Sequence, residues 1–171
     1  MELRRHTDSD GDVLSTDGIR HAVEIGAGLQ GDYDVAISSG AQRATQTIAC
    51  FLAGMGRPLA RGVRVDERFR SDVEERWKDA YGRAGAGDIE SFRRVDADLV
   101  EQESAAFGRA LADVFASLQD GERALIVGHS PMQEAAVYGL TGEMIEPLSK
   151  GAGVIVSTQD DDSYEVRVLE Q

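Results

Sequence analysis

The 171-residue sequence predicts an α/β fold, a three-layer α/β/α sandwich around a mostly parallel central sheet. Segments with strand-like and helix-like patterns alternate through most of the chain, as they do when helices pack on the strands that precede them. The most hydrophobic segment, residues 123–128, lacks polar alternation, which is typical of a central parallel strand buried on both faces. We expect residues 1–171 to form a single domain with one sizeable core.

The first part of the chain supplies three strands and two helices of this sandwich. A strand over residues 1–5 ends in the polar, turn-forming run 8–12. A helix should begin near Thr16, with Thr16 or Asp17 as its N-cap, and Gly31 should end it. The elements expected next are a strand at 33–38, a helix that follows Ala41 and continues through Leu52, and a weaker strand at 63–65.

Residues 67–98 differ in composition from the segments on either side. They are rich in charge and glycine, and Trp77 and Tyr81 provide most of their apolar surface. We expect one or two short helices here, forming a cover over a site rather than a separate domain. Trp77 and Tyr81 lie four residues apart, which favours packing within the cover, with stacking on a substrate as the alternative.

The last part of the chain continues the alternation and closes with a hairpin. An amphipathic helix is expected over about 103–118, with Phe107 and Leu111 among the apolar residues of one face. The elements expected after it are the strand 123–128, the helix 132–140 and a hairpin of 154–158 with 164–168, whose strands are separated by the polar run 159–163.

Composition and charge exclude several classes of function. A net charge of −13 disfavours nucleic acid as a partner, because binding to its phosphates draws on clustered Lys and Arg. No apolar stretch of about 18 residues could span a membrane, and the charged N-terminus does not resemble a signal peptide. The single cysteine, Cys50, lies in an apolar run and excludes an internal disulfide. We therefore expect a cytoplasmic protein with Cys50 as a small core residue.

Two histidines and two arginines stand where predicted strands end. Arg5 and His6 close the first strand, Arg43 follows the second, and His129 follows the most hydrophobic one. Because the carboxyl ends of parallel strands meet at one edge of the sheet, we expect these side chains at a common site. Arg4 alternates with Arg5 along the strand and points to the opposite face, so we expect a structural role for Arg4.

These residue types fit the transfer of a phosphoryl group. Guanidinium groups such as those of Arg5 and Arg43 bind phosphate oxygens in a bidentate way and stay charged. A neutral imidazole nitrogen can attack phosphorus and form a phosphohistidine that water then hydrolyses. His6 is the better nucleophile, because Arg5 adjoins it and the loop that follows is short. His129 would supply a hydrogen bond, or a charge when protonated, to the phosphoryl oxygens.

Four segments resemble motifs of the histidine phosphatase superfamily, the phosphoglycerate mutase-like group. They are residues 3–7, similar to the Arg-His-Gly signature; 14–22, similar to a Leu-Thr-x-x-Gly-x-x-Gln-Ala element; 34–47, similar to the second-strand motif; and 127–130, similar to the late histidine motif. The four segments occur along the chain in the same order as the motifs of the family. The resemblance implies a phosphoglycerate mutase-like fold, phosphate binding by Arg5 and Arg43, and catalytic roles for His6 and His129.

The sequence departs from the family pattern in two places. Thr7 stands where the family usually has glycine, so we expect the loop after the first histidine to pack differently. The identity of the proton-donating carboxylate depends on how the family motif is aligned with this sequence. Residues 65–69 resemble a Leu-Asn-Glu-Arg version of the motif, which implies Glu67 as the general acid, whereas a shifted register leaves the role to Asp72 or Glu74.

Metal-dependent chemistry is disfavoured. The aspartates of residues 8–12 superficially resemble a calcium loop, but the glycine and the twelfth position do not fit one. We expect a solvated turn with Asp12 at the edge of the pocket. Arg5 and Arg43 would repel a transition metal at the same place, so we expect neither a metal nor another cofactor. His21, on the first helix, is expected to be solvated.

The function that follows is that of a cofactor-independent phosphatase, a hydrolase of phosphomonoesters or phosphoramidates. The compact length and the Arg-His-Thr-Asp opening resemble small bacterial phosphohistidine phosphatases, which implies phosphorylated proteins as substrates. The longer segment 67–98 instead favours enclosure of a small phosphorylated metabolite. The alternatives are phosphoryl transfer as in phosphoglycerate mutase, and a non-catalytic domain that binds phosphorylated ligands.

Overall fold

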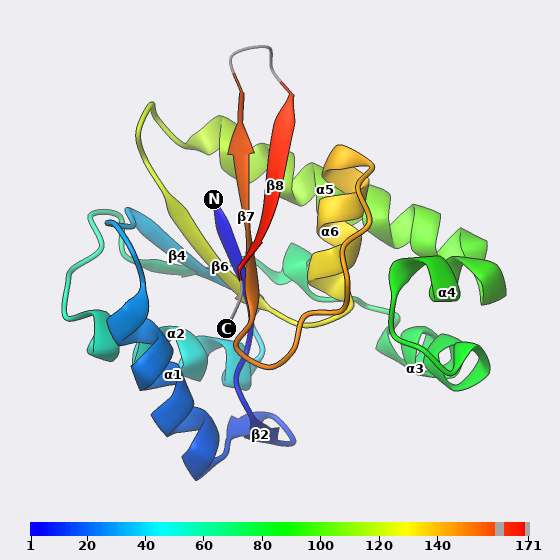
Figure 1. Cartoon of the computed structure of the whole chain (residues 1–171), viewed down its shortest axis with the longest axis horizontal. Coiled ribbons are helices and arrows are strands. Elements are labelled where there is room, and N and C mark those ends of the chain that lie inside the picture. Colours follow the sequence, from blue (N-terminus) through cyan, green and yellow to red (C-terminus); the bar gives the residue numbers. More distant parts are fainter. Residues whose placement is uncertain (160–162, 170–171) are drawn as a thin grey trace.

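The chain folds into a central sheet with helices on both of its faces (Figure 1). The computed structural model describes residues 1–159 and 163–169. Its strands are β1 (Glu2–Arg5), β2 (Ser9–Asp10), β3 (Val13–Leu14), β4 (Val35–Ser38), β5 (Val63–Val65), β6 (Ala124–Gly128), β7 (Gly153–Thr158) and β8 (Tyr164–Leu169). Its helices are α1 (Thr16–Gly28), α2 (Gln42–Met55), the 3-10 helix η1 (Glu67–Phe69), α3 (Glu74–Ala84), α4 (Ile89–Val95), α5 (Ala97–Ser117) and α6 (Met132–Thr141).

The main sheet has the strand order β5-β4-β6-β1-β7-β8, and β2 pairs with β3 in a separate small hairpin. The strands β5, β4, β6 and β1 are parallel, while β7 pairs antiparallel with β1, and β8 with β7. The mostly parallel sheet and the hairpin at its edge are thus confirmed. The hydrophobic run expected at the centre is β6, which lies between β4 and β1 and is buried along its whole length. Part of the polar run 159–163 expected between β7 and β8, namely residues 160–162, lies outside the described residues.

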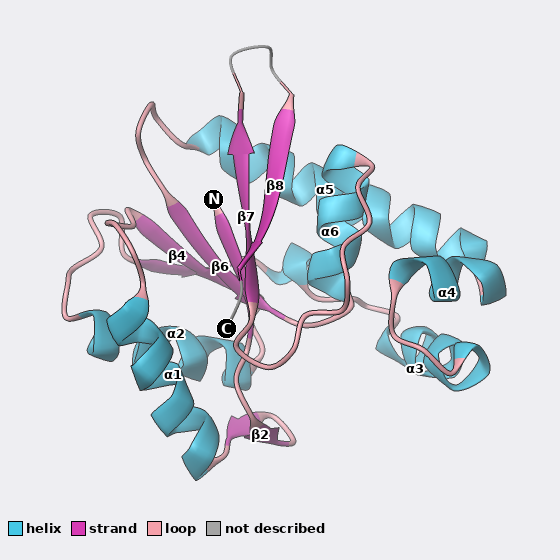
Figure 2. Cartoon of the chain, in the orientation of Figure 1, coloured by secondary structure: helices cyan, strands magenta, loops and turns pink. Residues whose placement is uncertain are grey.

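Each face of the sheet has its own helices and its own apolar core (Figure 2). The pair α1 and α2 packs on one face, where Phe51 is fully buried, and α5 and α6 pack on the other, where Leu111 is fully buried. Helices α5 and α6 approach closely because Gly139 has no side chain: a Cβ there would lie 1.7 Å from the backbone oxygen of Ser104. This arrangement confirms the three-layer sandwich. Within the described residues, no helix has the length and apolar character needed to cross a membrane.

The charged segment 67–98 forms η1, α3 and α4, and aromatic rings pack α3 against α4. Trp77 and Phe92 meet edge to face with ring centroids 5.1 Å apart, and the Tyr81 ring is tilted at 6.5 Å from that of Phe92. The indole N–H of Trp77 donates to the Glu103 carboxylate on α5 at 3.3 Å. Where one or two short helices were expected there are two, α3 and α4, and Trp77 attaches α3 to the long helix α5.

The boundaries of the first helix differ from the sequence-based expectation. Its N-cap is Ser15 rather than Thr16 or Asp17, because the Ser15 hydroxyl accepts a hydrogen bond from the Gly18 N–H at 3.0 Å. The helix ends at Gly28, before the expected glycine at position 31.

Two other elements also begin elsewhere than expected. Helix α5 starts at Ala97 rather than near residue 103, because the Asp96 carboxylate caps it by accepting from the Leu99 N–H at 3.1 Å. This first turn was not predicted, because residues up to 98 were expected to belong to the charged cover. Strand β4 starts at Val35, two positions after Tyr33, where the expected strand began.

Candidate active site

The register of two neighbouring parallel strands brings two histidines together. β1 and β6 pair so that Arg5 lies opposite Gly128, and the next residue on each chain segment is a histidine, His6 or His129. The His6 N–H also donates to the Gly128 carbonyl at 3.0 Å, which extends the pairing to the edge of the sheet. The two imidazole centroids are 5.2 Å apart. Two residues far apart in the sequence thus form one cluster at the carboxyl ends of the strands.

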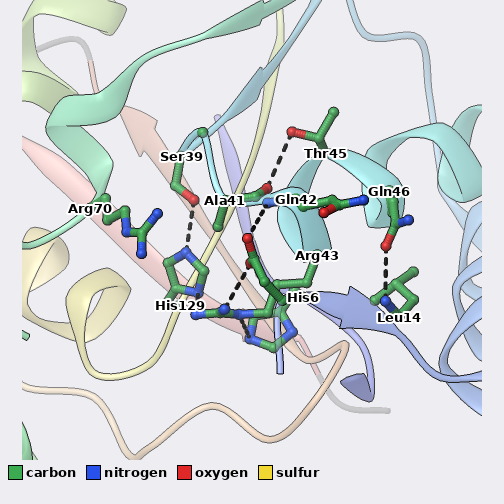
Figure 3. Close-up of polar contacts among 12 residues, drawn as sticks. His6, Leu14, Ser39, Ala41, Gln42, Arg43, Thr45, Gln46, Arg70 and His129 are labelled. Carbon is green, nitrogen blue, oxygen red and sulfur yellow. Dashed lines mark hydrogen bonds and ion pairs between the residues drawn. The ribbon is translucent and has the colours of Figure 1, made fainter. Parts of the chain in front are cut away.

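The guanidinium of Arg43 contacts both imidazole rings (Figure 3). Its Nε donates to Nε2 of His6 and its Nη2 to Nδ1 of His129, each at 3.2 Å. Arg43 lies in the first turn of α2, so the positive end of the helix dipole is directed at the same place. The structure therefore places three of the predicted site residues in direct contact.

These contacts fix the tautomer of each ring, because a guanidinium only donates hydrogen bonds. In His6 the Nε2 lone pair faces Arg43, and the proton is on Nδ1, which donates to the Thr7 carbonyl at 2.7 Å. In His129 the proton is on Nε2, which donates to the Ser39 hydroxyl at 2.8 Å. Nε2 of His6 is therefore a nitrogen with an available lone pair.

Both rings are neutral at physiological pH, because they are buried among positive charges. His6 is 4% exposed and His129 is 5% exposed. Burial, followed by the charge of Lys150, lowers the pKa of His6 to about 3. Burial, followed by the charges of Arg43 and Arg70, lowers the pKa of His129 to about 3 as well. The neutral state is the one in which an imidazole can act as a nucleophile.

Two more cations lie near this cluster. The predicted site residue Arg5 donates from Nη1 to the Leu148 carbonyl at 2.7 Å, and burial lowers its pKa, with Arg43 adding to the effect. The pKa of Lys150 is lowered by burial and by the charges of Arg5 and Arg43, and its own charge contributes to the lowered pKa of His6. Sequence reasoning missed Lys150, although it is one of only two lysines in an arginine-rich chain. The charges of Arg43 and Lys150 act on both histidines, so the cluster has a positive electrostatic environment.

Sequence reasoning also missed two residues next to His129. Ser39 is fully buried and accepts the hydrogen bond from Nε2 of that ring. Arg70 points its guanidinium toward the ring, and its charge contributes to the lowered pKa there. Ser39 follows β4 and Arg70 follows the weak strand β5 and η1. Ser39 directly follows a strand, as the histidines follow theirs, so the same signal could have identified it.

Asp12 lies at the edge of the site, beside the guanidinium that joins the two histidines. Its Oδ1 is 2.9 Å from Nη1 of Arg43, and its Oδ2 accepts from the Gln42 N–H at 3.3 Å. Burial opposes ionisation, but the N–H groups of Gln42 and Arg43 and the Arg43 charge outweigh it and lower the pKa of Asp12. This carboxylate holds Arg43 in place and competes with other anions for it.

Thr7, which replaces the glycine of the family signature, is fully buried and anchors the loop after His6. Its hydroxyl donates to the Gly18 carbonyl at 2.9 Å, and its N–H donates to the Thr47 hydroxyl at 3.3 Å. The loop is thereby tied to both α1 and α2. Since the Thr7 carbonyl accepts the Nδ1 proton of His6, this anchoring also orients the ring.

The three candidates for the general acid line one hollow of about 490 Å³ beside Ser39. Glu67 is nearest to the turn after β4: a Cβ on Gly40 would lie 3.3 Å from its Cγ and 3.8 Å from its Oε1. Its carboxylate has no hydrogen-bond or ion-pair partner among the described residues. Glu74 instead accepts from Nε of Arg70 at 2.7 Å. Asp72 is the third carboxylate of this hollow.

Other residues singled out in the sequence lie outside the cluster. Arg4 pairs with the Glu2 carboxylate at 2.6 Å and donates to the Gly151 carbonyl, which is the expected structural role. The expectation of a solvated His21 is wrong: the side chain is half-buried, because Gly151 returns close to its ring. Cys50 is half-buried against the core of the α1–α2 face. Within the described residues, no three His, Cys, Asp or Glu side chains are grouped as metal ligands would be.

Comparison with known proteins identifies the family. The family model "Histidine phosphatase superfamily (branch 1)" matches residues 2–167. Because this match covers almost the whole chain, the chain belongs to the histidine phosphatase superfamily. Among curated protein sequences, none matches significantly.

Three solved structures with a similar fold are distant from this chain in sequence. A mycobacterial glucosyl-3-phosphoglycerate phosphatase complexed with VO3 is 20% identical, with a TM-score of 0.68 over 98% of this chain and 96% of that one. The protein histidine phosphatase SixA complexed with tungstate is 17% identical, with a TM-score of 0.62 over 98% and 94% of the two chains. The phosphoserine phosphatase from Entamoeba histolytica, in complex with 3-phosphoglyceric acid, is 15% identical, with a TM-score of 0.72 over 99% and 96%. At these identities the likeness establishes the fold.

Proposed function

We propose that this chain is a phosphatase that hydrolyses phosphomonoesters or phosphoramidates through a phosphohistidine on His6. The observation that carries the proposal is the lone pair on Nε2 of His6, which lies beside the guanidinium of Arg43 and the ring of His129. Membership of the histidine phosphatase superfamily supports it. The three structures compared above are also phosphatases by name.

In the first half-reaction the phosphoryl group passes to His6. Arg43 turns its N–H groups from the rings to the phosphoryl oxygens, and Arg5 binds them from the other side. Nε2 of His6 attacks phosphorus, the new P–N bond forms, and the P–O or P–N bond to the leaving group breaks. The ring then carries a positive charge, which the Thr7 carbonyl stabilises through the Nδ1 proton. As Arg43 turns away, Nδ1 of His129 takes the proton that the monoanion of the substrate phosphate carries, and shares it as a hydrogen bond with a phosphoryl oxygen.

In the second half-reaction water releases the phosphoryl group. Glu67, having given its proton to the departing atom in the first step, takes a proton from water as the water oxygen attacks phosphorus. The P–N bond to His6 breaks, inorganic phosphate leaves, and Nε2 regains its lone pair. Glu67 is preferred to Glu74 because the Glu74 carboxylate is already bonded to Arg70. Asp72 is the remaining alternative.

Neither half-reaction uses a metal or another cofactor, because the guanidinium groups of Arg5 and Arg43 supply the positive charge that the transferring group needs. The substrate is a small phosphorylated metabolite or a phosphorylated protein. The compared structures include both kinds by name, since SixA is a protein histidine phosphatase and another is a phosphoserine phosphatase.

The test is phosphate release from p-nitrophenyl phosphate and glycerol 3-phosphate by the wild type and by His6→Ala. We expect the variant to lose about 10⁴-fold or more in kcat, because it lacks the nucleophile. Rapid quenching of the wild type with ³²P-labelled substrate should trap an acid-labile phosphoprotein that His6→Ala does not form. His21→Ala, which removes a histidine outside the site, should keep its activity, and chelation of metals should leave the wild type unchanged.

Two results would contradict the proposal. Binding of inorganic phosphate without turnover of any substrate would identify a non-catalytic phospholigand-binding domain. Transfer of the phosphoryl group to an added alcohol faster than to water would identify mutase-like chemistry.

A further inference from the structure

A pocket of about 260 Å³ opens beside the histidine cluster and extends along α3 and α4. Arg43 and His129 line it, so it is continuous with the proposed phosphate site. Its other walls include the apolar residues Trp77, Tyr81, Phe92, Pro131 and Met132. A phosphoryl group at His6 would therefore have its leaving group directed toward apolar and aromatic side chains.

The three aromatic residues of this pocket do not have the same role. Trp77 and Phe92 are 3% and 2% exposed and form the packed floor of the segment. Tyr81 is 57% exposed, yet its ring is tilted against that of Phe92 and lies next to Gly87, where a Cβ would be 3.5 Å from it. An aromatic ring held in this way presents a face to a ligand at a small cost in side-chain entropy. The expected packing is confirmed for Trp77, and the exposed ring of Tyr81 is the one to which the alternative of substrate stacking still applies.

The charges around the pocket disfavour an anionic leaving group. The Glu74 carboxylate and the Lys78 ammonium both line the pocket, and Glu75 lies next to Glu74 in the chain. The basic side chains at this end are already paired: Lys78 Nζ is 2.6 Å from a Glu75 oxygen, and Arg70 Nε is 2.7 Å from a Glu74 oxygen. A carboxylate on the leaving group would therefore meet Glu74 without gaining an unpaired cation from α3.

The size of the pocket limits the leaving group. A volume of about 260 Å³ is just below the roughly 300 to 1,000 Å³ of pockets that enclose drug-sized ligands. It suits one ring-sized group and not an extended peptide.

We infer that the substrate is the phosphomonoester of a small neutral alcohol that carries a ring, with the phosphate at His6 and the ring against Tyr81. The inference rests on the proposed function, because the phosphate has to be at His6 for the ring to reach Tyr81. A phosphorylated protein is the alternative that the following experiment decides.

The experiment compares kcat/KM for three monophosphates of primary alcohols: 2-phenylethyl phosphate, glycerol 3-phosphate and 3-phosphoserine. All three esters are cleaved at a primary alkoxide, so their differences report mainly on binding of the leaving group. We expect 2-phenylethyl phosphate to exceed each of the other two by at least about tenfold, because burial of a ring and its contact with Tyr81 are realised only by this substrate. A phosphorylated protein should be turned over more slowly than 2-phenylethyl phosphate.

Variants of the pocket connect this preference to Tyr81. Tyr81→Ala should reduce the ratio of kcat/KM between 2-phenylethyl phosphate and glycerol 3-phosphate by about threefold to tenfold. Tyr81→Phe, which keeps the ring, should retain the wild-type ratio. The matched control is Tyr164→Ala, which removes a tyrosine of the edge strand β8 whose ring is tilted against Phe115 and does not line this pocket, so the ratio should stay unchanged.

Several outcomes of these experiments would overturn the inference about the substrate. Equal rates for the three esters, faster turnover of 3-phosphoserine or of the protein substrate, or a ratio that Tyr81→Ala does not alter would each do so, while the proposed phosphatase activity would stand. Absence of phosphate release from every substrate, together with absence of a phosphorylated His6, would instead overturn the proposed function.

Discussion

The two ends of the proposed site are held in different ways. At the phosphate end, His6 and His129 follow paired residues of β1 and β6, are almost fully buried, and are joined by Arg43. At the other end, α3 and α4 pack through an aromatic cluster, and Tyr81 is more than half exposed. The first end depends on backbone pairing in the sheet. The second depends on side-chain packing of two short helices against α5.

This difference separates chemistry from selectivity. A change at the phosphate end disturbs groups that any phosphate ester would meet, so it should affect all substrates by the same factor. A change in the α3–α4 segment should alter the ratio between substrates. Substitution of Arg43 tests this separation at the phosphate end, and the Tyr81 variants test it at the other.

After the loss of the nucleophile in His6→Ala, the largest effect should come from Arg43→Lys. Lysine keeps the positive charge but lacks the planar fork that contacts two rings or two phosphoryl oxygens at once. We expect kcat/KM to fall by about 10³-fold, the upper end of what the loss of one preorganised donor costs. The fall should be the same for 2-phenylethyl phosphate and glycerol 3-phosphate in steady-state assays.

The control for this variant is Arg57→Lys, because Arg57 pairs with Asp32 on the surface and lies away from the histidines. It should retain wild-type rates. If Arg43→Lys retained activity within about threefold, or affected one substrate much more than the other, Arg43 would not contribute equally to the turnover of all substrates.

A smaller and more selective effect is expected for Glu67→Gln. An alkoxide needs a proton as it departs, whereas p-nitrophenolate does not, so the variant should lose about 10²-fold on glycerol 3-phosphate and little on p-nitrophenyl phosphate. The measurement is the first half-reaction in single-turnover kinetics. Asp72→Asn and Glu74→Gln, which change the other carboxylates of the same hollow, should show no such dependence on the leaving group.

If Asp72→Asn or Glu74→Gln gave that pattern and Glu67→Gln did not, the role of the acid would belong to the responding residue. The proposed nucleophile and phosphate ligands would be unaffected by this outcome.

Much of the phosphate end was predictable from the sequence. The histidines and Arg43 follow hydrophobic runs that become β1, β6 and β4, and residues after parallel strands share one edge of the sheet. The distance between His6 and His129 was not predictable, because it depends on the register of β1 with β6. The tautomers were not predictable either, since they follow from the contacts of Arg43.

The α3–α4 end was predictable only in outline. Charge and glycine content indicated short helices, and the spacing of Trp77 and Tyr81 indicated packing. Which ring would be buried depends on the position of Glu103 on α5, a contact between segments that the local pattern does not contain. The general acid stayed ambiguous for a similar reason, because three carboxylates near one another in sequence also line one hollow.

The smallest predicted effect concerns the pH dependence of stability, which should differ between the two ends. The unfolded chain protonates each histidine near pH 6.5, whereas a pKa of about 3 keeps His6 and His129 neutral in the folded state. The unfolded state therefore binds more protons as the pH falls. The stabilisation is fully present above about pH 6.5 and is lost progressively toward pH 3, by about 2 kcal/mol for each ring between pH 7 and 5.

The α3–α4 segment should lose stability only at lower pH. Side-chain hydrogen bonds from Arg76 lower the pKa of Asp96, and those from Ser91 lower the pKa of Asp88. These carboxylates contribute stability that is present above their unfolded pKa of about 3.9 and is lost as the pH falls below it. Urea unfolding at pH 7 and 5 therefore reports on the histidine cluster.

His6→Asn isolates this contribution from other groups that titrate in the same range. Glu134, for example, has its pKa raised by burial, so its contribution improves as the pH falls and opposes that of the histidines. Because Glu134 is present in both proteins, the difference between wild type and His6→Asn cancels it. The drop in the free energy of unfolding from pH 7 to pH 5 should be smaller in the variant by about 2 kcal/mol. Equal drops would mean that His6 is protonated in the folded protein at pH 5, and a nucleophile in that state would have no lone pair for phosphorus.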